Sequence, residues 1–137
     1  MNRVLLVNDK DEVCNRTATM LVDMGWDVYV ANKEELVFES SVARRPAMLI
    51  ADIEMDGGVG FEAIATARSL FDSLFIVAVT RGVDKEIWPQ VAEVCGANSY
   101  IAGPVSAAKL QEAIDAGIEK GLVSMEPPSE SGIYPSL

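Results

Sequence analysis

Apolar residues follow two different rhythms along this chain. Five short runs are apolar almost throughout and end in turn residues, a pattern typical of strands that are buried on both faces of a parallel sheet. Between these runs, apolar residues recur every three or four positions, which is the spacing of an amphipathic helix. The predicted strands are Val4–Val7, Asp27–Ala31, Met48–Asp52, Leu74–Val79 and Ser99–Ala102. The second of them is the least apolar, which favours a place near an edge of the sheet.

A helix is predicted after each strand, and glycine or proline marks where most of these helices end. Proline cannot continue a helix, and glycine is common just after the last turn. The predicted helices cover residues 13–24, 33–45, 61–71, 87–95 and 110–118. Strands and helices that alternate in this way form right-handed crossovers, so the sheet is parallel and helices cover both of its faces. We therefore expect a doubly wound, flavodoxin-like (βα)5 fold of the α/β class, with five strands in the order 2-1-3-4-5.

In that strand order the first and third strands lie side by side, and polar residues stand at their ends. Asp9 comes just after the first strand, Asp52 ends the third, and Thr80 follows the fourth. We expect these side chains to face one crevice at the carboxyl edge of the sheet. Two carboxylates, a hydroxyl and loop carbonyls form an all-oxygen site that suits Mg²⁺. An aspartate beside such an ion can accept a phosphoryl group, because the ion neutralises the charge that develops.

Composition limits the remaining function classes. The formal net charge of −10 argues against direct nucleic-acid binding, which needs a basic face. The chain has no histidine, so histidine-based catalysis and histidine metal ligands are excluded. No apolar run approaches the roughly 18 residues of a membrane span, and the first residues show no signal-sequence pattern. Cys14 and Cys95 form no disulfide or metal motif, which indicates reduced thiols and a cytoplasmic location.

The composition of the chain changes near residue 121. Residues 1–121 contain every predicted strand and helix, and they are numerous enough to bury the core of one domain. The following segment, residues 122–137, contains the run Pro127–Gly132, which is rich in proline and serine and is typical of a linker. We expect a linker-like or flexible tail there. Whether the chain ends in that tail or belongs to a longer protein stays open at this stage.

Four stretches together resemble the receiver domains of bacterial two-component response regulators, over roughly residues 3 to 121. They are Val4–Asp9, Asp52–Glu62, Ala78–Thr80 and Gly96–Pro104. The resemblance implies a domain of a phosphorelay, in which a histidine kinase or a phosphotransfer protein supplies the phosphoryl group. It also leaves a homodimer open as an assembly.

The resemblance further implies a role for individual residues. Asp52 would accept the phosphoryl group. Asp9, Asp52 and the backbone carbonyl of Glu54 would bind Mg²⁺ as the cofactor. Thr80 would contact the phosphoryl group, and Tyr100 would be the aromatic residue that changes rotamer with it.

Four positions depart from the pattern of that family, and one of them is Asp56, which stands in place of the proline usual in that turn. Asn8 stands where the first of two acids is usual, so it brings no charge and would reach the metal only through a water. Arg81 follows Thr80 where a small residue is normal. Gly103 replaces the lysine that usually precedes Pro104 and pairs with the phosphoryl oxygens. Without a substitute, loss of such a charge-assisted contact weakens the phosphorylated state by about 1.5–3 kcal/mol.

Arg81 is a candidate to replace that lysine as a surrogate cation, because it follows the fourth strand at the mouth of the site. The alternative is that its side chain points to solvent or pairs with a surface acid such as Glu54. If Arg81 is the substitute, Gly103→Lys should restore the phosphorylation that is lost when Arg81 is removed. We also expect a cis peptide bond before Pro104, as is usual in the family.

Three functions compete. The first is a phosphoacceptor receiver domain that signals through a partner or an output domain. The second is a degenerate receiver that binds a partner independently of phosphorylation, which Arg81 and Gly103 favour. The third function is that of a phosphatase with an aspartate nucleophile. Such enzymes carry the motif Asp-x-Asp-x-Thr near the first strand, whereas Asp52 ends the third strand. We therefore expect a signalling domain and not an enzyme.

Overall fold

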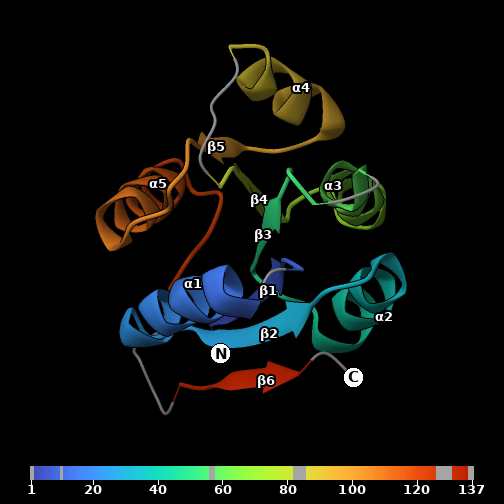
Figure 1. Cartoon of the computed structure of the whole chain (residues 1–137). Helices are drawn as coiled ribbons and strands as arrows, with labels where there is room; N and C mark the ends of the chain where they lie inside the picture. Colours follow the sequence, from blue (N-terminus) through green and yellow to red (C-terminus); the bar gives the residue numbers. More distant parts are fainter. Residues whose placement is uncertain (1, 10, 56–57, 82–85, 126–130, 136–137) are drawn as a thin grey trace.

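The computed structural model describes residues 2–9, 11–55, 58–81, 86–125 and 131–135 of the 137-residue chain. Strands and helices alternate through this part of the chain, as the apolar pattern predicts (Figure 1). The strands are β1 (Arg3–Val7), β2 (Asp27–Ala31), β3 (Met48–Asp52), β4 (Phe75–Val79), β5 (Ser99–Ile101) and β6 (Ile133–Pro135). The helices are α1 (Asp11–Asp23), α2 (Glu34–Arg44), α3 (Val59–Leu70), α4 (Trp88–Cys95) and α5 (Ala107–Glu119).

All strand pairs in the sheet are parallel, and the strand order is β5-β4-β3-β1-β2-β6. The first five strands therefore have the predicted order, with β1 and β3 side by side. Helices α1 and α5 lie on one face of the sheet, and α2 and α3 lie on the other (Figure 1). Each face has its own hydrophobic core, one around Leu21 and Ile114 and the other around Val37 and Ile64. These features confirm the flavodoxin-like α/β fold.

Strands β3 and β4 are buried at every residue because helices cover both of their faces. Helix α4 differs from this pattern, since its predicted apolar face is largely open. Ile87, which precedes the helix, is 58% exposed, and Val94 is 87% exposed, whereas Ala92 is buried. The helix lies beyond the β5 edge, where a three-residue strand offers little sheet to cover (Figure 1).

The sheet has a sixth strand, which corrects the prediction of five. Strand β6 runs parallel to β2 and pairs with it along its length. The rings of Tyr29 and Tyr134 stack with their centroids 5.1 Å apart, and the Val28 amide donates to the Gly132 carbonyl over 2.8 Å. Strand β2 is therefore an inner strand, and part of the segment 122–137 extends the sheet.

The rest of that segment is described in part. Residues 126–130 of the linker-like run lie outside the described residues, so the linker and the domain boundary at residue 121 stay predictions. Just before the run, Val123 packs into the core under α1 and α5 and is only 7% exposed. Cys14 is buried and Cys95 is partly buried in the structure.

Candidate functional site

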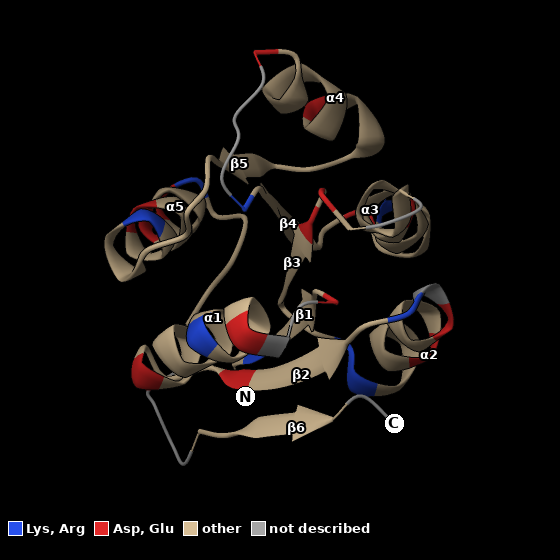
Figure 2. Ribbon diagram, in the orientation of Figure 1, with Lys and Arg blue, Asp and Glu red and all other residues tan. Residues whose placement is uncertain are grey.

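Three adjacent strand ends bring the predicted site residues together. Because β1 and β4 both pair with β3, the residues that follow these strands share the carboxyl edge of the sheet. Asp52, Asn8 and Thr80 stand at these ends and are 1%, 3% and 1% exposed. Asp9 follows Asn8, and its side chain is 25% exposed. Figure 2 shows the resulting charge pattern at this edge, with acidic residues after β1 and β3 and a basic residue after β4.

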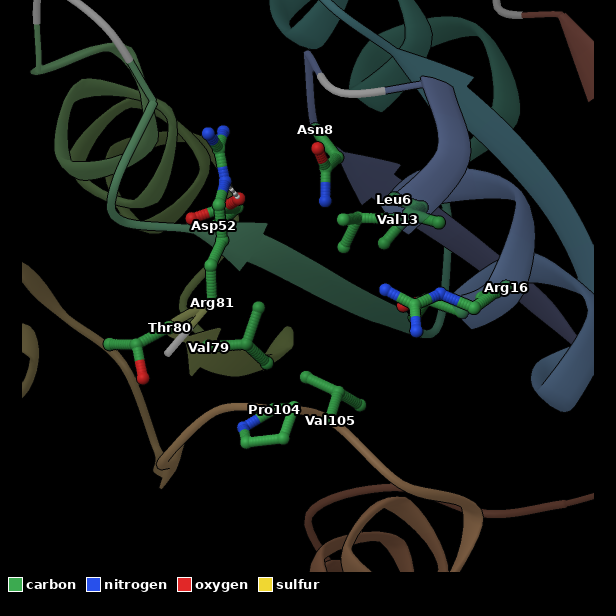
Figure 3. A pocket seen from close by; sticks show the side chains of 11 residues that line it. Leu6, Asn8, Val13, Arg16, Asp52, Val79, Thr80, Arg81, Pro104 and Val105 are labelled. Carbon is green, nitrogen blue, oxygen red and sulfur yellow. Dashed lines mark hydrogen bonds and ion pairs between the residues drawn. The ribbon is translucent and has the colours of Figure 1, made fainter. Parts of the chain in front are cut away.

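The Arg81 guanidinium lies between the two predicted acids of the site. Its Nε donates a hydrogen bond to Oδ2 of Asp52 (Figure 3), and its Nη2 donates one to Oδ1 of Asp9. Both contacts are also ion pairs, and the Arg81 side chain is 22% exposed. The expectation that this side chain points to solvent or pairs with Glu54 is therefore wrong. Only the backbone N–H of Arg81 reaches the Glu54 carboxylate, through Oε2.

Burial and charge pairing act in opposite directions on the Asp52 carboxyl. Its burial raises the pKa above the usual range of an aspartate, because a charged group is poorly solvated there. The hydrogen bonds from Arg81 and from the Glu54 amide, the latter 2.8 Å long, lower the pKa but do not cancel the rise. For Arg81, desolvation lowers the pKa, but the bonds to Asp52 and Asp9 outweigh it and leave the pKa raised. The Arg81 guanidinium therefore stays charged, whereas burying the charged Asp52 carboxylate costs free energy.

A cavity of about 40 Å³ opens beside Asp52. A single water needs roughly 10–15 Å³ of such space, so the cavity admits a few waters or a small anion. Asn8, Thr80 and Arg81 line it together with Pro104 of the loop after β5. The carboxylate that the sequence singled out therefore has open space in front of it.

Arg16, which the sequence did not single out, also lines this cavity. Figure 3 shows its guanidinium directed from α1 into the cavity, opposite Asp52. Among the residues that the structure describes, Arg16 has no hydrogen-bond or ion-pair partner. Helical spacing was the signal that could have found it, because Val13, Arg16 and Thr17 fall on one face of α1 and all three line the cavity.

The loop after β5 lies unusually close to the end of β4. The Gly103 amide donates to Oγ1 of Thr80 over 2.7 Å, and Figure 3 shows this hydroxyl directed away from Asp52. A Cβ atom at Gly103 would lie 2.1 Å from the carbonyl oxygen of Thr80. The Gly103–Pro104 peptide bond is cis, as predicted. The loop therefore has no room for a side chain where the family has lysine.

The predicted roles of Thr80, as a contact of the phosphoryl group, and of Tyr100, as an aromatic residue that changes rotamer, stay predictions. In this structure the Thr80 hydroxyl is engaged by the loop, so it must rotate before it can contact a group on Asp52. Tyr100 lies on β5 and packs, partly buried, against the core on the α2 and α3 face. Its place beside β4, opposite Ala78, fits an aromatic residue near the site.

The oxygen atoms at the site fit Mg²⁺ in kind, but Arg81 fills the space between the carboxylates. Asp9 and Asp52 supply carboxylates, and the backbone carbonyl of Glu54 is two residues beyond Asp52. In the described part of the chain, no group of three or more acids or cysteines is arranged to hold a metal ion. Asp9 and Asp52 can share a divalent cation only after the Arg81 guanidinium has moved away.

Comparisons with known proteins agree with this geometry. A family model described as the response regulator receiver domain matches residues 4–115. Among similar solved structures, a chemotaxis protein of Vibrio cholerae is 21% identical with a TM-score of 0.76, over 85% of this chain and 98% of that chain. The receiver domain of a modulated diguanylate cyclase from Desulfovibrio desulfuricans is 28% identical with a TM-score of 0.72, over 86% of this chain and 94% of that chain. A LuxR-family two-component response regulator from an Aurantimonas species is 24% identical with a TM-score of 0.77, over 91% of this chain and 89% of that chain. A search of curated proteins found no significant match. Within the described ranges, none of the helices has the length and apolar character to cross a membrane.

Proposed function

Because this chain belongs to the response regulator receiver family, we propose that it accepts a phosphoryl group on Asp52 and signals this state to a partner protein. The observation that carries the proposal is the buried Asp52 carboxylate, which stands at the end of β3 beside an open cavity. A histidine kinase or a phosphotransfer protein would donate the group, in the cytoplasm. The domain then acts as a switch and not as an enzyme with a released product.

In the proposed reaction, a carboxylate oxygen of Asp52 bonds to the phosphorus of the donor. The bond from phosphorus to the donor breaks, and the leaving group takes the electron pair. The acyl phosphate that forms brings new negative charge into a buried site, so nearby cations stabilise it. Bound Mg²⁺ would supply most of this charge neutralisation, held by Asp9, Asp52 and the Glu54 carbonyl, with Asn8 acting through a water.

Two arginines replace the family's lysine in this proposal. Arg81 already contacts Asp52, so its guanidinium remains the surrogate cation that the sequence suggested. Arg16 approaches from α1 on the other side of the cavity (Figure 3). A guanidinium binds two phosphoryl oxygens at once, which suits both residues to this contact.

A second candidate function is a degenerate receiver that binds its partner without phosphorylation. The specific observation that favours it is the closed loop at Gly103, which engages the Thr80 hydroxyl and excludes a lysine side chain. The two functions differ in one chemical event, the modification of Asp52.

The experiment that tests the proposal is intact-mass spectrometry of the wild-type chain after incubation with Mg²⁺ and a small phosphodonor. We expect a mass gain of one phosphoryl group, and peptide mapping should place it on Asp52. The matched incubation without donor is the control. No mass gain at any donor concentration would favour the degenerate receiver instead.

Arg16→Gln is expected to lower the yield of phosphorylated protein by about tenfold, the effect of one lost charge-assisted hydrogen bond. The yield is measured by intact mass at limiting phosphodonor. Lys120→Gln removes the same charge beyond α5, away from the site, and should leave the yield unchanged. Equal yields in Arg16→Gln and wild type would show that Arg16 does not reach the phosphoryl group.

A further inference from the structure

The contact between Arg81 and the two acids has a consequence for cation binding. We infer that Arg81 is an internal cation that occupies the metal position of this site, and that it competes with Mg²⁺ for Asp9 and Asp52. The inference deepens the proposed function, because it concerns the regulation of the same site. It does not require that Asp52 is ever phosphorylated.

The Arg81 guanidinium occupies the space between the two carboxylates. One guanidinium bridges two carboxylates that come from β1 and β3, through Nε on Asp52 and Nη2 on Asp9. These are the two side-chain carboxylates that a metal ion at this site would share. A divalent cation placed between them would meet the positive charge of Arg81 at close range, in a region where Asp52 is 1% exposed and screening is weak. The two cations therefore exclude each other.

Charge pairing is the second feature of the site that favours an internal cation. Asn8 is an amide at the end of β1, so Asp9 and Asp52 are the two carboxylates that Arg81 bridges, and the Glu54 carboxylate is held separately by the Arg81 backbone N–H. The single positive charge of Arg81 neutralises half of this charge. The guanidinium thereby reduces the repulsion between the two carboxylates when no metal ion is bound.

The side chain of Arg81 is also able to leave. Its backbone N–H is bonded separately to the Glu54 carboxylate, so the main chain stays in place when the guanidinium swings out. The side chain is 22% exposed, and its long flexible stem gives it a route to solvent. Release from Asp9 also frees the guanidinium to meet a phosphoryl group on Asp52. Arg81 thus fills the space between the carboxylates when no metal ion is bound. After its release from Asp9, it can contact a phosphoryl group on Asp52 while the metal ion is bound.

Metal binding by variants of the full chain tests this inference. Arg81→Gln keeps a polar side chain but removes the charge, and we expect its Mg²⁺ affinity to rise by about tenfold or more in isothermal titration calorimetry. Arg81→Lys keeps the charge without the two-pronged contact and should lie between Arg81→Gln and wild type. Lys120→Gln is the matched control and should bind Mg²⁺ as the wild type does. A Mg²⁺ affinity of Arg81→Gln at or below the wild-type value would overturn the inference.

Thermal unfolding gives a second measurement that does not depend on phosphorylation. Without metal, Arg81→Gln should unfold at a lower temperature than wild type, because its carboxylates are no longer neutralised. Added Mg²⁺ should raise its melting temperature more than that of the wild type. In an Asp9→Asn background, Arg81→Gln should no longer raise the Mg²⁺ affinity, since the shared ligand is lost. An equal Mg²⁺ shift in Arg81→Gln and wild type would contradict competition, even if Asp52 is readily phosphorylated.

Discussion

Asp52→Asn is expected to abolish phosphoryl uptake and to raise the melting temperature of the domain at neutral pH. An amide is not a nucleophile for phosphorus under these conditions, so the loss of modification should be complete. The gain in stability follows from the burial of Asp52, which is 1% exposed and whose pKa is raised despite its contact with Arg81. Asparagine has one acceptor oxygen for the two donors that meet Asp52, Nε of Arg81 and the Glu54 amide, so the replacement removes the buried charge and keeps one of the two hydrogen bonds.

The pH dependence of this stability gain has a definite sign. A carboxyl group with a raised pKa in the folded state holds its proton more tightly there than in the unfolded chain. The folded state therefore loses stability relative to the unfolded state as the pH rises from the ordinary pKa of an aspartate through the raised one. Asparagine does not titrate, so the advantage of Asp52→Asn should be absent below the ordinary pKa and complete above the raised pKa. Thermal unfolding of both proteins across this range measures the difference.

Asp9→Asn is the matched control for this prediction. It removes a carboxylate from the same guanidinium, but its side chain is 25% exposed instead of buried. Solvent screens this partly exposed ion pair more than the buried one, so we expect a smaller change in melting temperature than in Asp52→Asn. If Asp52→Asn is less stable than wild type at neutral pH, the ion pair with Arg81 outweighs the cost of burying Asp52, and the prediction is wrong.

The sequence predicts most of this fold because its strands carry strong local signals. Strand β4 is apolar throughout, β3 is apolar up to Asp52, and both are buried at every residue, which only a sheet covered on both faces explains. The positions of Asp9, Asp52 and Thr80 follow directly, since each stands at the end of such a strand. A site at the carboxyl edge of a parallel sheet is therefore visible in the sequence once its strands are assigned.

The features that the sequence could not predict depend on contacts between distant residues. Arg81 meets Asp52 and Asp9, which lie 29 and 72 residues away, so its direction follows from the assembled site and not from its neighbours. Strand β6 has only three residues, and its pairing depends on Tyr134 stacking on Tyr29 across the sheet edge. The open face of α4 was missed because an apolar helical pattern does not tell whether the fold supplies a surface to cover it.

The Gly103 loop is the clearest case in which the sequence suggested a simple loss and the structure indicates a rebuilt region. From the sequence, the residue before Pro104 is a lysine position without its lysine. In the structure, the Gly103 amide is bonded to the Thr80 hydroxyl, and the Thr80 amide donates to the Ile101 carbonyl over 3.2 Å. On the outer side, Lys109 of α5 donates to the carbonyls of the loop at Ala102 and Pro104, over 2.9 Å and 3.3 Å. These bonds fix the loop against β4.

Gly103→Lys is therefore expected to destabilise the domain, and not to restore a phosphorylation contact as the sequence alone suggested. A Cβ atom at this position would lie 2.1 Å from the Thr80 carbonyl oxygen and 2.5 Å from the carbonyl carbon of Arg81. Both are backbone atoms, so neither can rotate away, and the loop must separate from β4. Overpacking of this kind typically costs about 1–3 kcal/mol and more where backbone must move. That is a large part of the roughly 5–15 kcal/mol that stabilises a domain of this size.

Gly103→Ala separates the steric effect from the effect of the ammonium group, because it introduces the same Cβ atom without a charge. We expect both variants to lose a similar amount of stability in urea unfolding, with midpoints well below that of the wild type. Phosphorylation is measured by intact mass without urea, at a temperature where both variants remain folded. The yield of Gly103→Lys should not exceed that of Gly103→Ala. A Gly103→Ala midpoint equal to that of the wild type would show that the loop yields easily. In that case, a higher phosphorylation yield in Gly103→Lys than in Gly103→Ala would mean that the ammonium group can still reach Asp52, and that Arg81 and Arg16 only partly replace it.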